Sequence, residues 1–369
     1  MKIEVFEMER MQSTHENLVD YDMSESGILP VSMNDLIDMG FDLNSVLDMP
    51  LGYSQSDGTP EVKDLLTQIY PGAAHENIEV TNGTSEANYL IALSQIVEGD
   101  EFAMQIPNYM QLWGVPRSLG GIVNPFRLRS ENNWEIDWDE FDRAVAPKTR
   151  LVYISNPNNP SGSVLSDEAM QRIVDRCEEM DAYLISDEVY IGAEHDGNRT
   201  KSFWGMSEKV IVTSGLSKAY GIPGIRVGWI IGPPDLVAAC WSQHDYITIG
   251  PNKLSDRMTR VAIEAESREK LYKRTTVILN ENLPLLEKWV QDVPQLVYTP
   301  SQAGAFCFLK LNLDVPSREV AKACLENQST LIVPGAHFGM EGYIRVWFGG
   351  SQDFIEEGFR RIKKELNTL

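Results

Sequence analysis

The chain has 369 residues, of which 43% are hydrophobic and 23% charged, proportions that are typical of a globular enzyme with a substantial core. Its net charge of −22 argues against binding to nucleic acids or anionic membranes. No apolar run approaches the roughly 18 residues of a membrane span, and the N-terminus lacks signal-peptide features, so we expect a cytoplasmic protein. The four cysteines and five histidines lack metal-binding spacing, which predicts buried free thiols and no metal site.

The first predicted strand, 78–81, leads into a turn of small polar residues. This turn contains Gly83, Thr84 and Ser85, and a helical stretch follows it. Free backbone amides at a helix start, together with the helix dipole, favour an anion at that position. The segment therefore predicts a phosphate seat at the end of the strand, although an ordinary helix N-terminus would have the same pattern.

Two further apolar runs, 150–155 and 182–186, are typical of buried strands. The first opens into the turn-forming loop 156–162, which can present the side-chain amide of Asn159 rigidly. The second stops at Asp187, and Tyr190 follows three residues later, so a carboxylate and a phenol leave the same strand end. Each feature also has a purely structural explanation, because Asn-Pro loops are common turns and an aspartate can cap a helix.

The strand 210–213 and the turn after it are the most informative part of the chain. The turn carries Lys218 and, eight residues later, Arg226. Ligands of open α/β sheets lie beyond the carboxyl ends of the strands, which puts Lys218 where chemistry is expected. Burial of this lysine would lower its pKa and make the neutral amine, which forms Schiff bases, accessible near neutral pH. A solvated surface lysine is the alternative when Lys218 is considered alone.

The order of the elements predicts two domains. Strand runs alternate with amphipathic helices such as 166–179 over the middle of the chain, which favours a mostly parallel sheet covered on both faces. We assign 46–262 to this large domain, and 1–45 with 263–369 to a smaller α+β domain. Its predicted elements are the helix 267–290, which Pro284 should kink or interrupt, the strands 305–311 and 343–348, and the final helix 352–366.

Together these motifs resemble the class I/II aminotransferases, a family of fold-type-I enzymes that depend on pyridoxal 5′-phosphate. The resemblance covers nearly the whole chain and implies an α/β fold with the cofactor at the strand ends. It implies that Lys218 forms the Schiff base and then moves the substrate α-proton. It implies that Asp187 keeps the pyridine nitrogen protonated. The other implied cofactor contacts are Asn159 and Tyr190 at the phenolic oxygen, Tyr109 stacked on the ring, and Thr84, Ser85, Ser217 and Arg226 at the phosphate.

The resemblance also concerns the substrate and the quaternary structure. It implies that Arg345 binds the α-carboxylate of an amino acid substrate, an anion that suits the two-pronged guanidinium. It implies that Tyr53 reaches the phosphate of a neighbouring subunit, which makes the protein a homodimer with shared active sites. One position departs from the pattern, because many relatives carry Ser or Thr three residues before the lysine and this chain has Gly215. The phosphate contacts are therefore less firmly predicted than the lysine.

In the family, the N-terminal segment folds over the mouth of the active site. Here it resembles ordinary members and also capreomycidine synthase-like enzymes, which cyclise hydroxylated arginine. The residues that could then meet the substrate are Glu9, Asp22 and Glu25 as partners of a guanidinium, His15 as an acid or base, and Ser26 and Gly27 of the Ser-Gly-Ile motif. The alternative is an amphipathic helix with Phe6, Met8 and Met11 packed inward and the charges in solvent.

Transamination of an α-amino acid, through a Schiff base at Lys218 and abstraction of the α-proton, is the expected reaction. The alternative is a cyclodehydratase that converts a hydroxyarginine to a cyclic guanidino amino acid of the capreomycidine or enduracididine type. A regulatory protein that retains the fold without catalysis is a third possibility. It is disfavoured by the intact set Asn159, Asp187, Tyr190, Lys218, Arg226 and Arg345.

Overall fold

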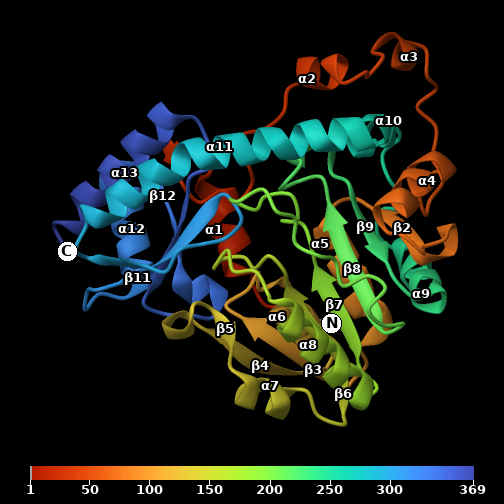
Figure 1. Cartoon of the computed structure of the whole chain (residues 1–369), viewed down its shortest axis with the longest axis horizontal. Helices are drawn as coiled ribbons and strands as arrows, with labels where there is room; N and C mark the ends of the chain where they lie inside the picture. Colours follow the sequence, from red (N-terminus) through yellow and green to blue (C-terminus); the bar gives the residue numbers. More distant parts are fainter. Residues whose placement is uncertain (1) are drawn as a thin grey trace.

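The structure, a computed structural model, describes residues 2–369 and is built around an eight-stranded sheet (Figure 1). Strands β9 and β5 run antiparallel to their neighbours, and the other strands are parallel to one another. In sheet order the strands are β2 (Ile78–Thr81), β9 (Gly228–Ile231), β8 (Val210–Gly215), β7 (Tyr183–Asp187), β6 (Thr149–Ser155), β3 (Glu101–Ile106), β4 (Ile122–Arg129) and β5 (Glu135–Ile136).

Both faces of this sheet are buried, because apolar side chains alternate between them along each strand. In β6, Leu151 and Tyr153 belong to one buried cluster, whereas Val152 and Ile154 belong to the other. The first cluster includes side chains of α5 (Thr84–Gln95), α6 (Gln111–Ser118) and α9 (Pro234–His244). The second includes side chains of α4 (Pro60–Ile69), α7 (Trp138–Ala144), α8 (Asp167–Glu179) and α10 (Lys253–Ile263).

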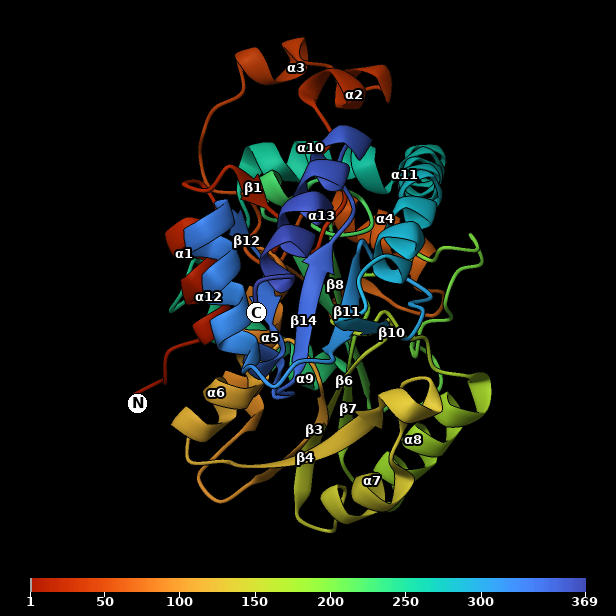
Figure 2. The same ribbon diagram turned by 90° about the vertical axis from the view of Figure 1, so that its left-hand side faces the viewer.

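The C-terminal part of the chain forms a smaller antiparallel sheet with helices against it (Figure 2). Its strand order is β10 (Leu296–Tyr298), β11 (Phe306–Leu311), β14 (Tyr343–Trp347) and β13 (Val333–Pro334). The helices are α11 (Ala265–Gln291), α12 (Ser317–Gln328) and α13 (Gln352–Leu366). The rings of Trp289 and Phe359 stack at 4.3 Å and thereby join α11 to α13. Short 3₁₀ turns lie at η1 (His75–Asn77), η2 (Ser130–Asn132), η3 (Pro223–Ile225) and η4 (Gly335–Phe338).

The N-terminal segment packs on this C-terminal unit before it crosses to the large sheet. Strand β1 (Tyr21–Asp22) pairs in parallel with β12 (Thr330–Leu331), and Glu7 of α1 (Glu7–His15) forms an ion pair with Arg318 of α12. The next helices, α2 (Met33–Asp38) and α3 (Asn44–Leu47), stand away from the body of the molecule in both views. Residues 1–45 were assigned to the smaller domain, and the boundaries at 46 and 262 stay a prediction.

One expectation from the sequence is wrong in part. Pro284 does not interrupt the long helix, because α11 continues from Ala265 to Gln291 with the proline inside it. Leu279 and Leu286, on either side of the proline, are fully buried, so tertiary packing compensates for the backbone hydrogen bond that Pro284 cannot donate. The four cysteines are buried, as predicted. Within residues 2–369, no helix combines the length and apolar character that a membrane crossing requires.

Candidate active site

The carboxyl ends of the parallel strands meet in register at one edge of the large sheet. Ser155 of β6 pairs with Asp187 of β7, which in turn pairs with Thr213 of β8. The polar segments after these strands surround a cavity of about 420 Å³. The predicted site residues that line this cavity are Glu9, Glu25, Ser26, Thr84, Ser85, Tyr109, Asn159, Asp187, Tyr190, Ser217, Lys218 and Arg226.

Lys218 lies in the turn after β8 and contacts the N-terminal segment. Its Nζ donates a hydrogen bond to the Oγ of Ser26 at 2.8 Å and lies 3.8 Å from the Oε1 of Glu25. Desolvation lowers the pKa of Lys218, but Tyr190 and Glu25 raise it more, so the net shift is upward. The lowered pKa that burial alone predicts is therefore wrong for this chain. Electrostatic interactions with Tyr190 and with Glu25, which comes from the N-terminal segment, outweigh the desolvation.

Asp187 ends β7 as a buried carboxylate with an exposed fraction of 6%. Its Oδ2 accepts hydrogen bonds from Asn88 Nδ2 at 3.1 Å and from the hydroxyl of Tyr153 at 3.2 Å. Burial raises the pKa of Asp187, and these hydrogen bonds oppose the shift. No cationic side chain of residues 2–369 forms a salt bridge with it, so a protonated nitrogen on a ligand could bind there.

The first turn of α5 and the Arg226 side chain form an electropositive seat. Gly83 precedes the helix with φ 93°, a conformation that glycine adopts without strain. A Cβ at this position would lie 2.4 Å from Nη2 of Arg226, so glycine also allows the guanidinium to approach the turn. Nη1 of Arg226 donates to the Oγ of Ser217 at 3.4 Å and to the carbonyl of Pro223 at 3.0 Å. Thr84 opens the helix, where backbone amides lack a preceding turn and can bind an anion.

Gly215 has a steric explanation in the structure. It ends β8 and pairs with Gly228 of β9, and a Cβ at Gly215 would lie 2.7 Å from both the Oγ1 of Thr84 and the carbonyl oxygen of Val227. The position therefore has no room for a serine or threonine side chain. The Thr84 hydroxyl occupies the adjacent space instead.

Two buried hydroxyl groups at the cavity lack a partner. Neither the hydroxyl of Tyr190 nor the Oγ1 of Thr84 makes a hydrogen bond within the described part of the chain. The Tyr190 ring is held edge-on against Phe306 with ring centroids 5.1 Å apart. Because buried polar groups are nearly always hydrogen-bonded, both hydroxyls are suited to bind a ligand in the cavity.

Arg345, in the middle of β14, is almost fully buried, with an exposed fraction of 1%. Its Nη1 donates to the Oδ1 of Asn159 at 2.9 Å, and its Nη2 donates to the backbone carbonyl of Ser24. Its Nε makes no hydrogen bond to any of the described residues. Arg345 is not itself in the cavity wall, but it contacts the wall through Asn159.

Helix α1 forms the acidic side of the cavity. Glu9, Gln12 and Glu16 face it with i, i+3 and i+7 spacing, and the Oε1 of Glu9 accepts a hydrogen bond from the Tyr109 hydroxyl at 2.8 Å. On the apolar side of the helix, Met8 is buried, and Phe6 and Met11 pack against the core. The inward packing of Phe6, Met8 and Met11 is as the amphipathic-helix interpretation predicts, and contact between Glu9 and a substrate stays a prediction.

Some predicted residues lie elsewhere, and some residues at the site were not predicted. His15 and Tyr53 do not line the cavity, and Tyr53 is 89% exposed beside a separate hollow. Gly27 is behind the wall, and its carbonyl accepts a hydrogen bond from Trp347 Nε1 at 2.6 Å. Gln12, Glu16, Asn88 and Tyr153 also line the cavity and were not predicted, although the helical spacing from Glu9 could have indicated the first two.

Comparisons with known proteins agree with this geometry. The sequence profile of the family "Aminotransferase class I and II" matches residues 45–362. The capreomycidine synthase of Streptomyces vinaceus is 29% identical over 302 residues, which cover 82% of this chain and 77% of that protein. A PLP-dependent aminotransferase from Streptococcus suis 89-1591 superposes with a TM-score of 0.93 at 29% identity, over 100% of this chain and 99% of that one.

A second solved structure, the PLP-dependent cyclase OrfR, superposes with a TM-score of 0.91 at 25% identity and covers 100% of this chain and 98% of that one. The likeness to these structures confirms the predicted α/β fold of type I. The proteins that the chain resembles thus include an aminotransferase, a capreomycidine synthase and a PLP-dependent cyclase.

Proposed function

The chain belongs to the class I and II aminotransferase family and uses pyridoxal phosphate, and from this premise we propose that it transfers the amino group of an α-amino acid. The observation that carries the proposal is the cavity at the strand ends, around which a lysine amine, a buried carboxylate and an anion seat are arranged. Each of these groups matches a different part of the cofactor. The space of about 420 Å³ is of the size expected for a small-molecule site.

The residues present fit pyridoxal phosphate. The unpartnered hydroxyls of Tyr190 and Thr84 match its phenolic oxygen and its phosphate, and the unpaired Asp187 matches its pyridine nitrogen. The approach of Arg226 to Gly83 makes a cradle that a Cβ would fill. When bound, the cofactor supplies an aldehyde for the amino group and a ring that withdraws electrons from the substrate α-carbon.

In this proposal, the cavity residues hold the cofactor and move one proton. Lys218 carries the cofactor covalently and afterwards takes the α-proton on its Nζ, with Ser26 and Glu25 orienting the amine. Asp187 keeps a proton on the ring nitrogen. The remaining ligands are Asn159 and Tyr190 at the phenolic oxygen, the Tyr109 ring on the cofactor face, and Thr84, Ser85, Ser217 and Arg226 at the phosphate.

The substrate α-carboxylate is assigned to Arg345. Rings of Phe306 and Phe338 lie 5.7 and 5.0 Å from its Cζ and restrict the guanidinium, while Asn159 fixes one of its nitrogens. A fixed guanidinium fork binds a carboxylate through two parallel hydrogen bonds. An arginine in these surroundings therefore sets the direction in which the amino acid presents its α-carbon to Lys218.

A homodimer with shared active sites is part of the same proposal. Tyr53 is 89% exposed and cannot serve the cavity of its own chain in this position, as expected for a residue that reaches a neighbour. Other large side chains are exposed as well, including Leu47 and Leu51 near Tyr53 in the sequence and Tyr246 after α9. A second copy of the chain would bury this surface.

A cyclodehydratase acting on a hydroxyarginine is the second candidate, and the acidic side of the cavity favours it. Glu9, Glu16 and Glu25 all line the cavity. Burial raises the pKa of Glu16, and repulsion from Asp22, Glu25 and Glu9 adds to the shift, so these carboxylates lie near one another. Carboxylates in this arrangement would attract a guanidinium substrate side chain.

Incubation with single amino acids, hydroxyarginine included, distinguishes the two reactions. Transamination produces a keto acid and pyridoxamine phosphate, whereas cyclodehydration produces a product that has lost water and kept its amine. If no amino acid changes the cofactor spectrum or yields a product, both candidates are wrong. Glu9→Gln should weaken binding of a cationic substrate, and Glu4→Gln, in the same segment but paired with Arg117 outside the cavity, is the matched control.

A further inference from the structure

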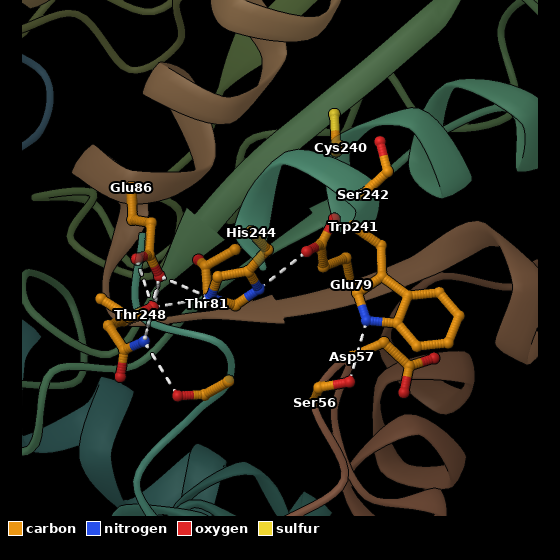
Figure 3. Close-up of polar contacts among 12 residues, drawn as sticks. Ser56, Asp57, Glu79, Thr81, Glu86, Cys240, Trp241, Ser242, His244 and Thr248 are labelled. Carbon is orange, nitrogen blue, oxygen red and sulfur yellow. Dashed lines mark hydrogen bonds and ion pairs between the residues drawn. The ribbon is translucent and has the colours of Figure 1, made fainter. Parts of the chain in front are cut away.

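A buried ionic network lies directly behind the first turn of α5 (Figure 3). At its centre is His244, the last residue of α9, whose side chain is fully buried. Its Nδ1 is 2.9 Å from Oε1 of Glu79 on β2, and its Nε2 is 3.2 Å from Oε2 of Glu86 on α5. The Thr248 hydroxyl lies 2.8 Å from the same Nε2 and donates to Oε1 of Glu86 at 2.6 Å.

Glu86 connects this network to the turn that precedes the helix. Its Oε2 accepts the backbone N–H of Asn82 at 2.5 Å and the Asn82 side-chain amide at 3.1 Å. The Thr81 hydroxyl donates to the carbonyl of Gly83 at 3.0 Å within the same turn. Residues 81–83 are therefore fixed on one side by Glu86, while Thr84 and Ser85 face the cavity on the other.

We propose that His244 is a positioning residue for the phosphate seat, because it neutralises Glu86 while Glu86 holds the turn. The inference rests on the proposed role of the α5 N-terminus in binding the cofactor phosphate. A carboxylate in the first turn of a helix repels an incoming anion. A cation paired with the carboxylate cancels this repulsion, and the carboxylate keeps its hydrogen bonds. Neither His244 nor Glu86 lines the cavity, so both act through the turn.

The charges around His244 support a protonated imidazole. Burial lowers the pKa of His244, but Glu79 and Glu86 raise it more, to about 9. Burial raises the pKa of Glu86, but its bonds to His244, Thr248 and Asn82 lower it more, to about 2. Glu79 is the other carboxylate in contact with the ring, and burial raises its pKa, with Asp57 adding repulsion. Near neutral pH, His244 and Glu86 are thus both charged, and the net charge of the pair is close to zero.

The test compares binding of pyridoxal phosphate with binding of pyridoxal, which has the aldehyde and ring but no phosphate. Full-length His244→Gln should bind pyridoxal phosphate about tenfold more weakly, while its affinity for pyridoxal stays within about twofold. Both affinities are measured by absorbance titration at pH 7.5, with competition by inorganic phosphate as a second readout. Cys240→Ala is the matched control, because Cys240 is buried one turn earlier in α9 and contacts Ser94 rather than the turn.

A pH series adds a readout that a purely structural role would not change. In the wild type, the affinity for pyridoxal phosphate divided by that for pyridoxal should fall between pH 8 and pH 10, because His244 loses its proton there. In His244→Gln this ratio should not change over the same pH range. Glu86→Gln keeps an acceptor for Asn82 but removes the charge that opposes the anion, so its preference for pyridoxal phosphate over pyridoxal should not fall below that of the wild type; this variant serves if His244→Gln does not fold, and a loss of the preference in it would contradict the proposal.

Three further results overturn the proposal. They are equal weakening of both ligands in His244→Gln, unchanged affinities in His244→Gln, or the same loss of phosphate preference in Cys240→Ala. If the wild type bound neither aldehyde, the proposed function itself would fall as well, so the two failures are distinguishable.

Discussion

Replacing Gly215 with alanine tests the close packing at the end of β8. The added Cβ would meet the Oγ1 of Thr84 and the carbonyl oxygen of Val227, each at 2.7 Å. The Val227 carbonyl accepts a hydrogen bond from Leu216 at 3.0 Å, so the backbone cannot retreat without weakening the contact between β8 and β9. Overpacking of this kind costs about 1–3 kcal/mol. The smaller backbone entropy of alanine in the unfolded chain offsets about 0.4–1 kcal/mol.

The expected net effect of Gly215→Ala is thus a loss of about 1–2 kcal/mol in the free energy of unfolding. Urea unfolding at one protein and one cofactor concentration measures it, since ligand and partner binding also change apparent stability. Gly224→Ala is the control, because nothing lies within 4 Å of a Cβ there. Adding Thr84→Ala should recover part of the loss. If Gly215→Ala were as stable as the wild type, the steric account of this glycine would be wrong.

Three further predictions concern the cavity and the network behind it. Arg345→Lys should raise KM for the amino acid about tenfold or more, because one ammonium cannot replace two parallel hydrogen bonds. Steady-state kinetics measure this change. An unchanged KM would contradict the assignment of the substrate carboxylate to Arg345. Tyr190→Phe should leave the unfolding free energy of the cofactor-free chain nearly unchanged, since its hydroxyl has no partner among residues 2–369, but should shift the pH midpoint of the bound cofactor's absorbance. An unshifted midpoint would remove Tyr190 from the cofactor contacts. Because the folded pKa of His244 is about 9 against an ordinary 6.5, its stabilising contribution is complete below about pH 6.5 and is lost as the pH rises through about 9. Urea unfolding of the wild type should show this loss, and that of His244→Gln should lack it.

The strand ends were predictable because their signals are local. Apolar runs followed by Gly, Asn or Asp marked the ends of β2, β6, β7 and β8. Parallel strands bring their carboxyl ends together at one edge of the sheet. The final helix was predicted with the bounds that α13 has, since its apolar periodicity is regular. The residues that line the cavity from these ends, such as Lys218 and Asp187, follow from the same local patterns.

What the sequence did not predict depends on contacts between distant segments. The upward pKa shift of Lys218 comes from Tyr190 and Glu25, side chains of other segments that a burial argument for the turn alone does not include. Glu79 was assigned to an apolar strand, and its pairing with His244 joins residues 165 positions apart. Gly215 was recognised as a departure, but only the position of Thr84 against it shows why a larger residue is excluded. In each case the deciding partner comes from another element of the fold.

The most direct test of the central claim is to locate the cofactor on the chain. Borohydride reduces a carbon–nitrogen double bond to a stable amine, so reduction of the holoenzyme followed by peptide mass mapping identifies the lysine that carries pyridoxal phosphate. The account predicts a single labelled peptide that contains Lys218, and loss of both the label and the bound-cofactor absorbance band in Lys218→Ala. A label on another lysine, or an absorbance band that persists in Lys218→Ala, would contradict it.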